Sequence, residues 1–212
     1  MIMHPPAIAL FFASALPWLD VAGIAVFAAS GALAAARLQK DIVTFGFFAA
    51  ITGTGGGTVR DLLIGAPVFW MHDPTPLAEC LVVSLLVWIT PRGWWGVRAL
   101  DWLDAVGLAA YSVFGAAKAQ AWGIPALPAA GMGVVTACLG GVIRDVLAGV
   151  PSIVLRPELY VTCAALAASC YVGLEALGLS PIVAALIAAA AGFLLRAAAI
   201  LGDLSLPAYR KK

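Results

Sequence analysis

Seven long apolar stretches follow one another along the chain, separated by short segments that hold charged and turn-forming residues. Within each stretch the apolar residues are continuous and rich in Ala and Leu, whereas a membrane β-strand alternates apolar with polar residues. About 20 apolar residues are enough for a helix to cross a bilayer. The pattern therefore predicts an all-α integral membrane protein with seven transmembrane helices. We expect these helices over residues 18–37, 42–63, 75–91, 102–121, 126–147, 158–177 and 180–201.

The composition also indicates a membrane protein and gives no reason to expect a nucleic-acid partner. Hydrophobic residues make up 63% of the 212-residue chain and charged residues only 11%, and the mean hydropathy is +1.03. A soluble domain carries roughly 25% charged residues, so this chain holds too much apolar surface for one soluble core. The formal net charge of +1 offers no broad basic surface.

One motif occurs twice at a fixed distance. Residues Thr52–Pro67 read TGTGGGTVRDLLIGAP, and residues Thr136–Pro151 read TACLGGVIRDVLAGVP. Arg144 follows Arg60 by 84 positions, and no gap is needed between the copies. The same shift relates further pairs: Asp20 and Asp104, Gly23 and Gly107, Phe27 and Tyr111, and Gly31 and Gly115. A constant offset over this length indicates an internal duplication.

The duplication predicts the domain organisation. Each copy contains three predicted spans, and an odd number of spans makes the second copy enter the membrane from the opposite side. We therefore expect two inverted three-helix repeats, at 18–91 and 102–177, followed by a seventh helix at 180–203. Residues 1–17 lack the basic start of a signal peptide, so we expect an uncleaved leader. Residues 204–212 form a basic tail.

The distribution of Lys and Arg predicts the orientation. Cytoplasmic loops of membrane proteins carry an excess of these residues. An outside N-terminus puts nine of them on the cytoplasmic side: Arg37, Lys40, Arg92, Arg98, Arg156, Arg196, Arg210, Lys211 and Lys212. We expect a multi-pass protein of the plasma membrane with its C-terminus in the cytoplasm.

The glycines of the second span allow two interpretations. Gly53, Gly55, Gly56 and Gly57 lie near the middle of the span, where so many glycines weaken a helix. A kink there would free backbone carbonyls, which membrane proteins tolerate only when they are buried or line a wet cavity. The alternative is close helix packing without a kink, because small residues let helices approach in lipid.

The second copy of the motif has fewer glycines. It keeps Gly140 and Gly141 but has Ala137 and Leu139 in place of Gly53 and Gly55, so we expect a milder kink. Thr52 and Thr136, together with the freed carbonyls, would supply oxygen ligands for a cation that has lost its water.

Two Arg-Asp pairs, Arg60-Asp61 and Arg144-Asp145, lie late in the second and fifth spans. A charge within a span costs at least ~2.5 kcal/mol on insertion scales. Neighbouring helical residues point ~100° apart, so we expect each arginine to pair with a carboxylate of the other repeat. The groups would be structural ion pairs or snorkelling side chains, or they would surround a hydrated path.

The remaining polar residues give few further functional signals. Lys118, late in the fourth span, either snorkels to the interface or is a mobile charge that responds to voltage and gates a path. Asp20 and Asp104 are more typical of helix caps than of ion ligands. The scattered Cys and His residues, with no recognisable catalytic motif, predict neither an enzyme nor a cofactor or metal site.

The doubled GG-xx-RD-xxx-G-x-P motif in a seven-span chain resembles the prokaryotic branch of the trimeric intracellular cation (TRIC) channel family, over about residues 18–203. The resemblance implies a homotrimer in membrane lipid with one pore in each subunit, lined by the first, second, fourth and fifth helices. It implies passive conduction of K⁺ and also Na⁺. A secondary transporter of a small solute such as glycine, a label this family has also carried, is the alternative. The pore candidates are Thr52, Gly53, Gly55, Gly56, Gly57, Arg60, Asp61, Thr136, Gly140, Gly141, Arg144 and Asp145.

Overall fold

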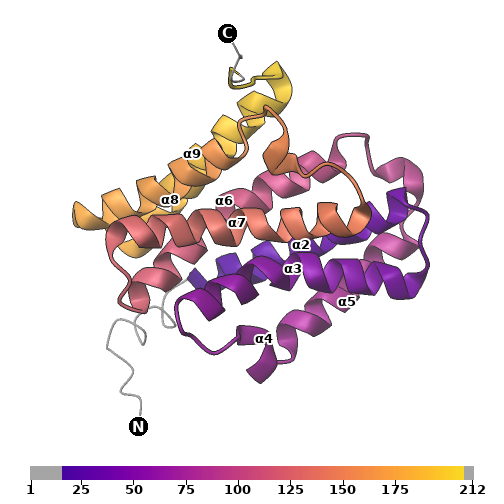
Figure 1. The fold of residues 1–212 in the computed structure, drawn as a ribbon, viewed down its shortest axis with the longest axis horizontal. Coiled ribbons are helices and arrows are strands. Elements are labelled where there is room, and N and C mark those ends of the chain that lie inside the picture. Colours follow the sequence, from indigo (N-terminus) through magenta and orange to yellow (C-terminus); the bar gives the residue numbers. More distant parts are fainter. Residues whose placement is uncertain (1–15, 208–212) are drawn as a thin grey trace.

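The computed structural model describes residues 16–207, which form a bundle of α-helices (Figure 1). The long helices are α2 Leu16–Arg37, α3 Ile42–Leu63, α5 Thr75–Ile89, α6 Ala99–Ala121, α7 Ala126–Ala148, α8 Val161–Ala176 and α9 Pro181–Gly202. The short helices are α4 Phe69–His72, η1 Arg92–Trp94 and η2 Ile153–Leu155. Every predicted span corresponds to one long helix, with ends that differ by at most three residues. Residues 1–15 of the predicted leader and 208–212 of the predicted tail lie outside the described part.

Local signals in the loops explain where two of the helices begin. Asp41 precedes α3, and its Oδ1 accepts a hydrogen bond of 2.8 Å from the backbone N–H of Thr44. Asp73 lies before α5, and its carboxylate accepts a bond of 2.9 Å from the Thr75 N–H. These bonds lower the pKa of both aspartates and satisfy N–H groups that the first turn leaves free.

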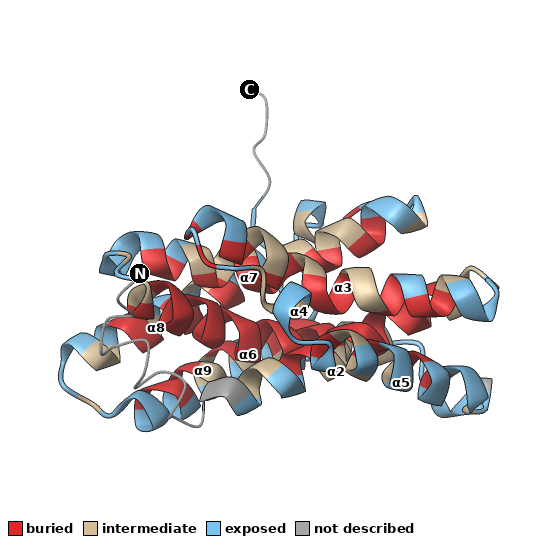
Figure 2. Cartoon of the chain, turned by 90° about the horizontal axis from the view of Figure 1, so that it is seen from below, coloured by how far each residue is buried: buried red, intermediate tan, exposed pale blue. Residues whose placement is uncertain are grey.

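The four helices that carry the duplicated motif and its partners form the centre of the bundle. α2 packs on α3 and α6, and α7 packs on α3 and α6. α5 covers α2 and α3 on one side, whereas α8 and α9 cover α6 on the other. Figure 2 shows the resulting pattern, with buried residues concentrated along the middle of the bundle and exposed residues around it.

Glycines let α3 and α7 cross with their backbones in contact. A Cβ on Gly56 would collide with the carbonyl oxygen of Thr136, and a Cβ on Gly140 would stand 2.5 Å from the carbonyl oxygen of Thr52. The two contacts are reciprocal, because Thr136 and Gly140 lie 84 positions after Thr52 and Gly56.

The helix breaks that would free backbone carbonyls in α3 and α7 are absent. α3 runs without interruption from Ile42 to Leu63, and α7 from Ala126 to Ala148. The prediction of freed carbonyls at Gly53–Gly57 and Gly140–Gly141 is therefore wrong, and close packing is the correct interpretation. The contact between the two backbones compensates for the poor helix propensity of glycine, because tertiary packing supplies most of the stability of a helix in a protein.

The exposed surface of the bundle suits a lipid environment. Leu81, Val82, Leu85 and Leu86 of α5 are all more than half exposed. Four described helices are long and apolar enough to cross a membrane, namely α2, α3, α7 and α9, and α5 and α8 are shorter apolar helices. α6 is also long, but it carries the charged residues Asp101, Asp104 and Lys118. The chain is thus a multi-pass, all-α membrane protein.

Candidate functional site

Arg60, Asp61 and Lys118 form one buried charged group, which we name the α3 cluster. The Arg60 Nε donates to Asp61 Oδ1 at 2.8 Å, and Lys118 Nζ lies 2.9 Å from the same oxygen. The second oxygen of Asp61 accepts a bond of 3.1 Å from the backbone N–H of Phe69, at the start of α4. One carboxylate therefore joins two cations and the end of the following loop.

Aromatic rings enclose the cations of the α3 cluster. The Arg60 guanidinium lies over the rings of Phe114 and Phe69, at 5.1 and 5.9 Å from their centroids. Lys118 Nζ lies 5.6 Å from the Trp122 ring and 5.7 Å from the Phe69 ring. The negative faces of these rings stabilise cations where there is little water. The two Nη atoms of Arg60 have no hydrogen-bond partner within residues 16–207.

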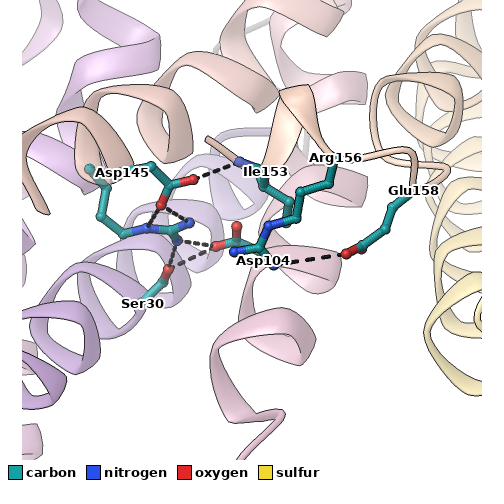
Figure 3. Close-up of polar contacts among 7 residues, drawn as sticks. Ser30, Asp104, Asp145, Ile153, Arg156 and Glu158 are labelled. Carbon is teal, nitrogen blue, oxygen red and sulfur yellow. Dashed lines mark hydrogen bonds and ion pairs between the residues drawn. The ribbon is translucent and has the colours of Figure 1, made fainter. Parts of the chain in front are cut away.

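Arg144, Asp145, Asp104 and Ser30 form the second group, which we name the α7 cluster (Figure 3). Arg144 donates to Asp145 Oδ1 through Nε at 2.9 Å and Nη2 at 2.7 Å, and to Asp104 Oδ1 through Nη1 at 2.6 Å. Its Nη1 also contacts the hydroxyl of Ser30, which donates to Asp104 at 2.7 Å. Asp145 Oδ2 accepts from the Ile153 N–H at 2.8 Å, as Asp61 does from Phe69.

The predicted pairing of the arginines is wrong. Each arginine contacts the aspartate next to it in sequence, and the additional carboxylate at Arg144 is Asp104, from the same repeat. The 100° separation on the helix does not prevent this, because the long arginine side chain folds back toward its neighbour. The ion pair between the repeats is instead that of Lys118 with Asp61.

Three other expectations are also corrected. Lys118 does not snorkel, because it is only 5% exposed and is paired with a carboxylate. Asp20 and Asp104 are not helix caps, because α2 and α6 begin several residues earlier, at Leu16 and Ala99. Instead Asp104 belongs to the α7 cluster, and Asp20 faces a cavity.

Two cavities approach the clusters from opposite ends of α2 and α6. The larger measures ≈ 540 Å³ and is lined by Lys118, Asp20, Glu79 and Trp122, among other residues. The smaller measures ≈ 340 Å³, and its wall includes Arg144, Asp145 and Arg156. Both cavities therefore combine apolar walls with charged groups of both signs.

The glycine and threonine candidates are buried in the bundle, except for Gly55, which is half-buried. Tyr111 donates a long bond of 3.3 Å to the carbonyl of Gly53, and Thr136 Oγ1 donates to its own helix at 2.6 Å. Thr52 Oγ1 is buried and has no hydrogen-bond partner in the described part of the chain. The remaining glycines touch side chains across helix contacts: Gly55 faces Ile143, Gly57 faces Phe69, and Gly141 faces Tyr160.

Sequence reasoning missed the neutral members of the clusters. Ser30 and Phe114 lie 84 positions apart, and each contacts the arginine of the other repeat, so the duplication could have identified them.

The expected position of Arg196 at the cytoplasmic surface is wrong, because this residue is fully buried and donates to Glu158 at 2.7 Å. Nothing in its local sequence indicates that burial.

Buried ion pairs on central helices, with a cavity leading to each, are typical of membrane proteins that move polar solutes or ions. Comparison with known proteins agrees with this class. A family model described as Glycine transporter matches residues 17–92 and again residues 101–176. A UPF0126 membrane protein of Vibrio cholerae is 41% identical over 92% of this chain and 83% of its own length. The UPF0126 inner membrane protein YadS of Escherichia coli is 43% identical over 68% of this chain and 72% of its own.

Comparison with solved structures also finds membrane proteins, and these are cation channels. The TRIC trimeric intracellular cation channel orthologue from Rhodobacter sphaeroides superposes with a TM-score of 0.83 and 41% identity, over 89% of this chain and 98% of that one. A prokaryotic TRIC channel in 0.5 M KCl superposes with a TM-score of 0.82 and 28% identity, over 90% and 98%. The chain therefore belongs to the family that the Glycine transporter model describes, and its likeness to prokaryotic TRIC channels is confirmed.

Proposed function

We propose that this protein is a passive channel for monovalent cations, K⁺ and also Na⁺, with one path inside each subunit. The observation that carries the proposal is the pair of cavities that end at the α3 and α7 clusters, from opposite ends of the central helices. In this proposal the path runs between α2, α3, α6 and α7, the helices that carry the two clusters, and the similarity to TRIC cation channels supports a cation as the conducted ion.

The described conformation corresponds to a closed path. Thr52, Thr136, Gly56 and Gly140 are buried where α3 and α7 touch, so no continuous opening joins the cavities at this crossing. Because both helices are unbroken, ions would pass hydroxyl and carboxylate oxygens rather than freed carbonyls. Opening then requires the charged clusters to rearrange.

Lys118 is the residue we assign to gating. It carries a charge, lines the larger cavity and pairs with Asp61. A charge that crosses 100 mV gains ~2.3 kcal/mol, which offsets a large part of the roughly 3–5 kcal/mol that breaking a buried ion pair costs. Voltage that draws Lys118 toward the cavity would release Asp61 and Arg60 from the closed arrangement.

The assembly and topology complete the proposal. We propose a homotrimer in the lipid of the plasma membrane, with seven spans that form two inverted three-helix repeats and a seventh helix, α9. The two matches of one family model support the duplication, because residues 17 and 101 differ by the same 84 positions. The N-terminus lies outside, which puts the larger cavity on the outer side and the Arg144 cavity on the cytoplasmic side.

The test is the reversal potential of purified protein in a planar bilayer with asymmetric KCl. A channel of this kind gives a potential near that of K⁺, and exchange of K⁺ for Na⁺ leaves a current. A potential near that of Cl⁻ would contradict cation selectivity.

The description of the matching family model favours a second function, secondary transport of glycine. Current recordings in the same bilayers, together with glycine uptake into vesicles that contain the same protein, distinguish the channel from the transporter. A transporter would give no single-channel current and would accumulate labelled glycine only when an ion gradient is imposed, whereas the channel conducts without glycine.

A further inference from the structure

Four buried polar atoms next to the α7 cluster have no hydrogen-bond partner among residues 16–207. They are Tyr160 OH, Asp104 Oδ2, and Nε and Nη1 of Arg196. All three residues are 0% exposed. Most buried polar atoms in proteins are paired with protein groups or with ordered water, so this concentration of unpaired atoms indicates a ligand.

Two of these atoms face one small space beside Gly141. A Cβ placed on Gly141 would stand 3.4 Å from Tyr160 OH and 3.5 Å from Asp104 Oδ2, and 3.7 Å from Nη2 of Arg144. Both oxygens therefore lie around one point beside Gly141, and no hydrogen bond joins them in the described part of the chain. Glycine at position 141 leaves this point without a side chain of its own.

Arg196 holds Tyr160 in this position. Its guanidinium lies over the tyrosine ring, 5.3 Å from the centroid, and its Nη2 is fixed by Glu158 at 2.7 Å. Glu158 in turn lies 3.8 Å from Arg156, a pair that Figure 3 shows beside the α7 cluster. The ring is thus contacted from α9, while its hydroxyl lies beside Gly141 of α7.

We propose that Tyr160, Asp104 and Gly141 form a binding site for one water molecule. The water accepts a hydrogen bond from Tyr160 OH and donates one to Asp104 Oδ2, and its free lone pair faces the guanidinium groups. The charges favour a neutral ligand, because the three arginines of this region balance its three carboxylates: Arg144, Arg156 and Arg196 against Asp104, Asp145 and Glu158. A bound water is stable when it has two to four polar partners, which this site supplies.

The bound water links α9 to Arg144. Asp104 Oδ1 binds Arg144, and Oδ2 reaches the Tyr160 hydroxyl through the water, while the Tyr160 ring contacts Arg196. The position equivalent to Tyr160 in the first repeat is Pro76, so only the α7 cluster has this link. The site itself does not depend on the proposed function. Its effect on conduction does, because there the water helps to hold Arg144 in the closed arrangement.

High-resolution structures test the site directly. We expect a density peak within hydrogen-bond distance of Tyr160 OH and Asp104 Oδ2 in the unmodified protein. Tyr160→Phe removes the donor and Gly141→Ala fills the space, so the peak should disappear in both. A direct Tyr160–Asp104 bond, an empty site, or an anomalous signal from Rb⁺ at this point would each overturn the proposal.

Conduction gives a second, separable readout. Tyr160→Phe and Gly141→Ala should each raise the open probability about tenfold, and the double variant should gain no more than either alone, because both changes remove the same water. Tyr171→Phe, at a buried tyrosine of α8 outside this site, is the control and should leave gating unchanged. Effects that multiply in the double variant would contradict a shared water. If the unmodified protein passes no current, the proposed function fails while the density experiment still decides the water site.

Discussion

At the scale of single residues, Asp61 and Asp145 have the same dual role. One oxygen of each carboxylate binds the preceding arginine, and the other accepts the first N–H of the short helix that follows, from Phe69 or Ile153. The carboxylate thus neutralises a buried charge and fixes the next segment. The identity of the charged residues was evident from the sequence. Their partners were not, because these depend on arginine rotamers that spacing along a helix does not determine.

Asp61→Asn should destabilise the protein strongly, because it leaves Arg60 and Lys118 buried without a carboxylate. Removing one partner of a buried ion pair costs roughly 3–5 kcal/mol in soluble proteins. Lys118→Met should cost less, since Asp61 keeps Arg60, but it should remove the voltage dependence of the current. Thermal unfolding in detergent and bilayer recordings measure the two effects. Equal losses of stability in both variants would show that Asp61 does not serve two cations.

The helix caps predict a dependence of stability on pH. Hydrogen bonds from Thr44 hold the pKa of Asp41 below its usual value of about 3.9, so its contribution is present above that pH. The contribution is lost as the pH falls through the lowered pKa in the folded state. Asp41→Asn keeps an acceptor but does not titrate, so it should show a smaller loss of thermal stability between pH 5 and pH 2. Identical pH profiles would rule out this role for the cap.

At the scale of helices, the sequence predicted the bounds of every long helix because apolar length and polar turns are local signals. It did not predict the unbroken course of α3 and α7. Glycine lowers the intrinsic stability of a helix, but here the crossing partner approaches so closely that only glycine fits, and that partner is distant in sequence: Thr136 for Gly56 and Thr52 for Gly140. The neighbours of Arg196 are also distant in sequence, because Glu158 and Tyr160 lie in the segment just before α8.

Alanine substitutions separate the effect of the close contact between α3 and α7 from the effect of the low helix propensity of glycine. Gly56→Ala and Gly140→Ala should force α3 and α7 apart and lower the unfolding temperature, because each methyl group meets a backbone carbonyl. Gly131 also lies on α7, but a Cβ added there would meet no other atom within 4 Å. Gly131→Ala should therefore stabilise the helix by about 0.5–1 kcal/mol. Unfolding temperatures of the three variants are the measurement. A stabilising effect of Gly56→Ala would refute the close crossing.

At the scale of the whole molecule, the topology and the assembly are both accessible to experiment. A reporter active only in the cytoplasm, fused after Lys212, should be active, because the basic residues favour that side. Light scattering in mild detergent should give three chains per particle. A reporter active only outside would invert the assignment of the cavities, and a monomer at every concentration would remove the trimer from the proposal.

The positions of the two cavities have an electrical consequence. In the proposed channel, aqueous electrolyte enters both from opposite sides and carries each bulk potential into the protein, so the voltage falls across the buried layer between them. The shorter this layer is than the ~30 Å hydrocarbon thickness, the steeper the local field becomes. Lys118 lies at one border of this layer. A displacement of a few ångströms would therefore move its charge through a large fraction of the membrane voltage, as in a capacitor with a narrow gap.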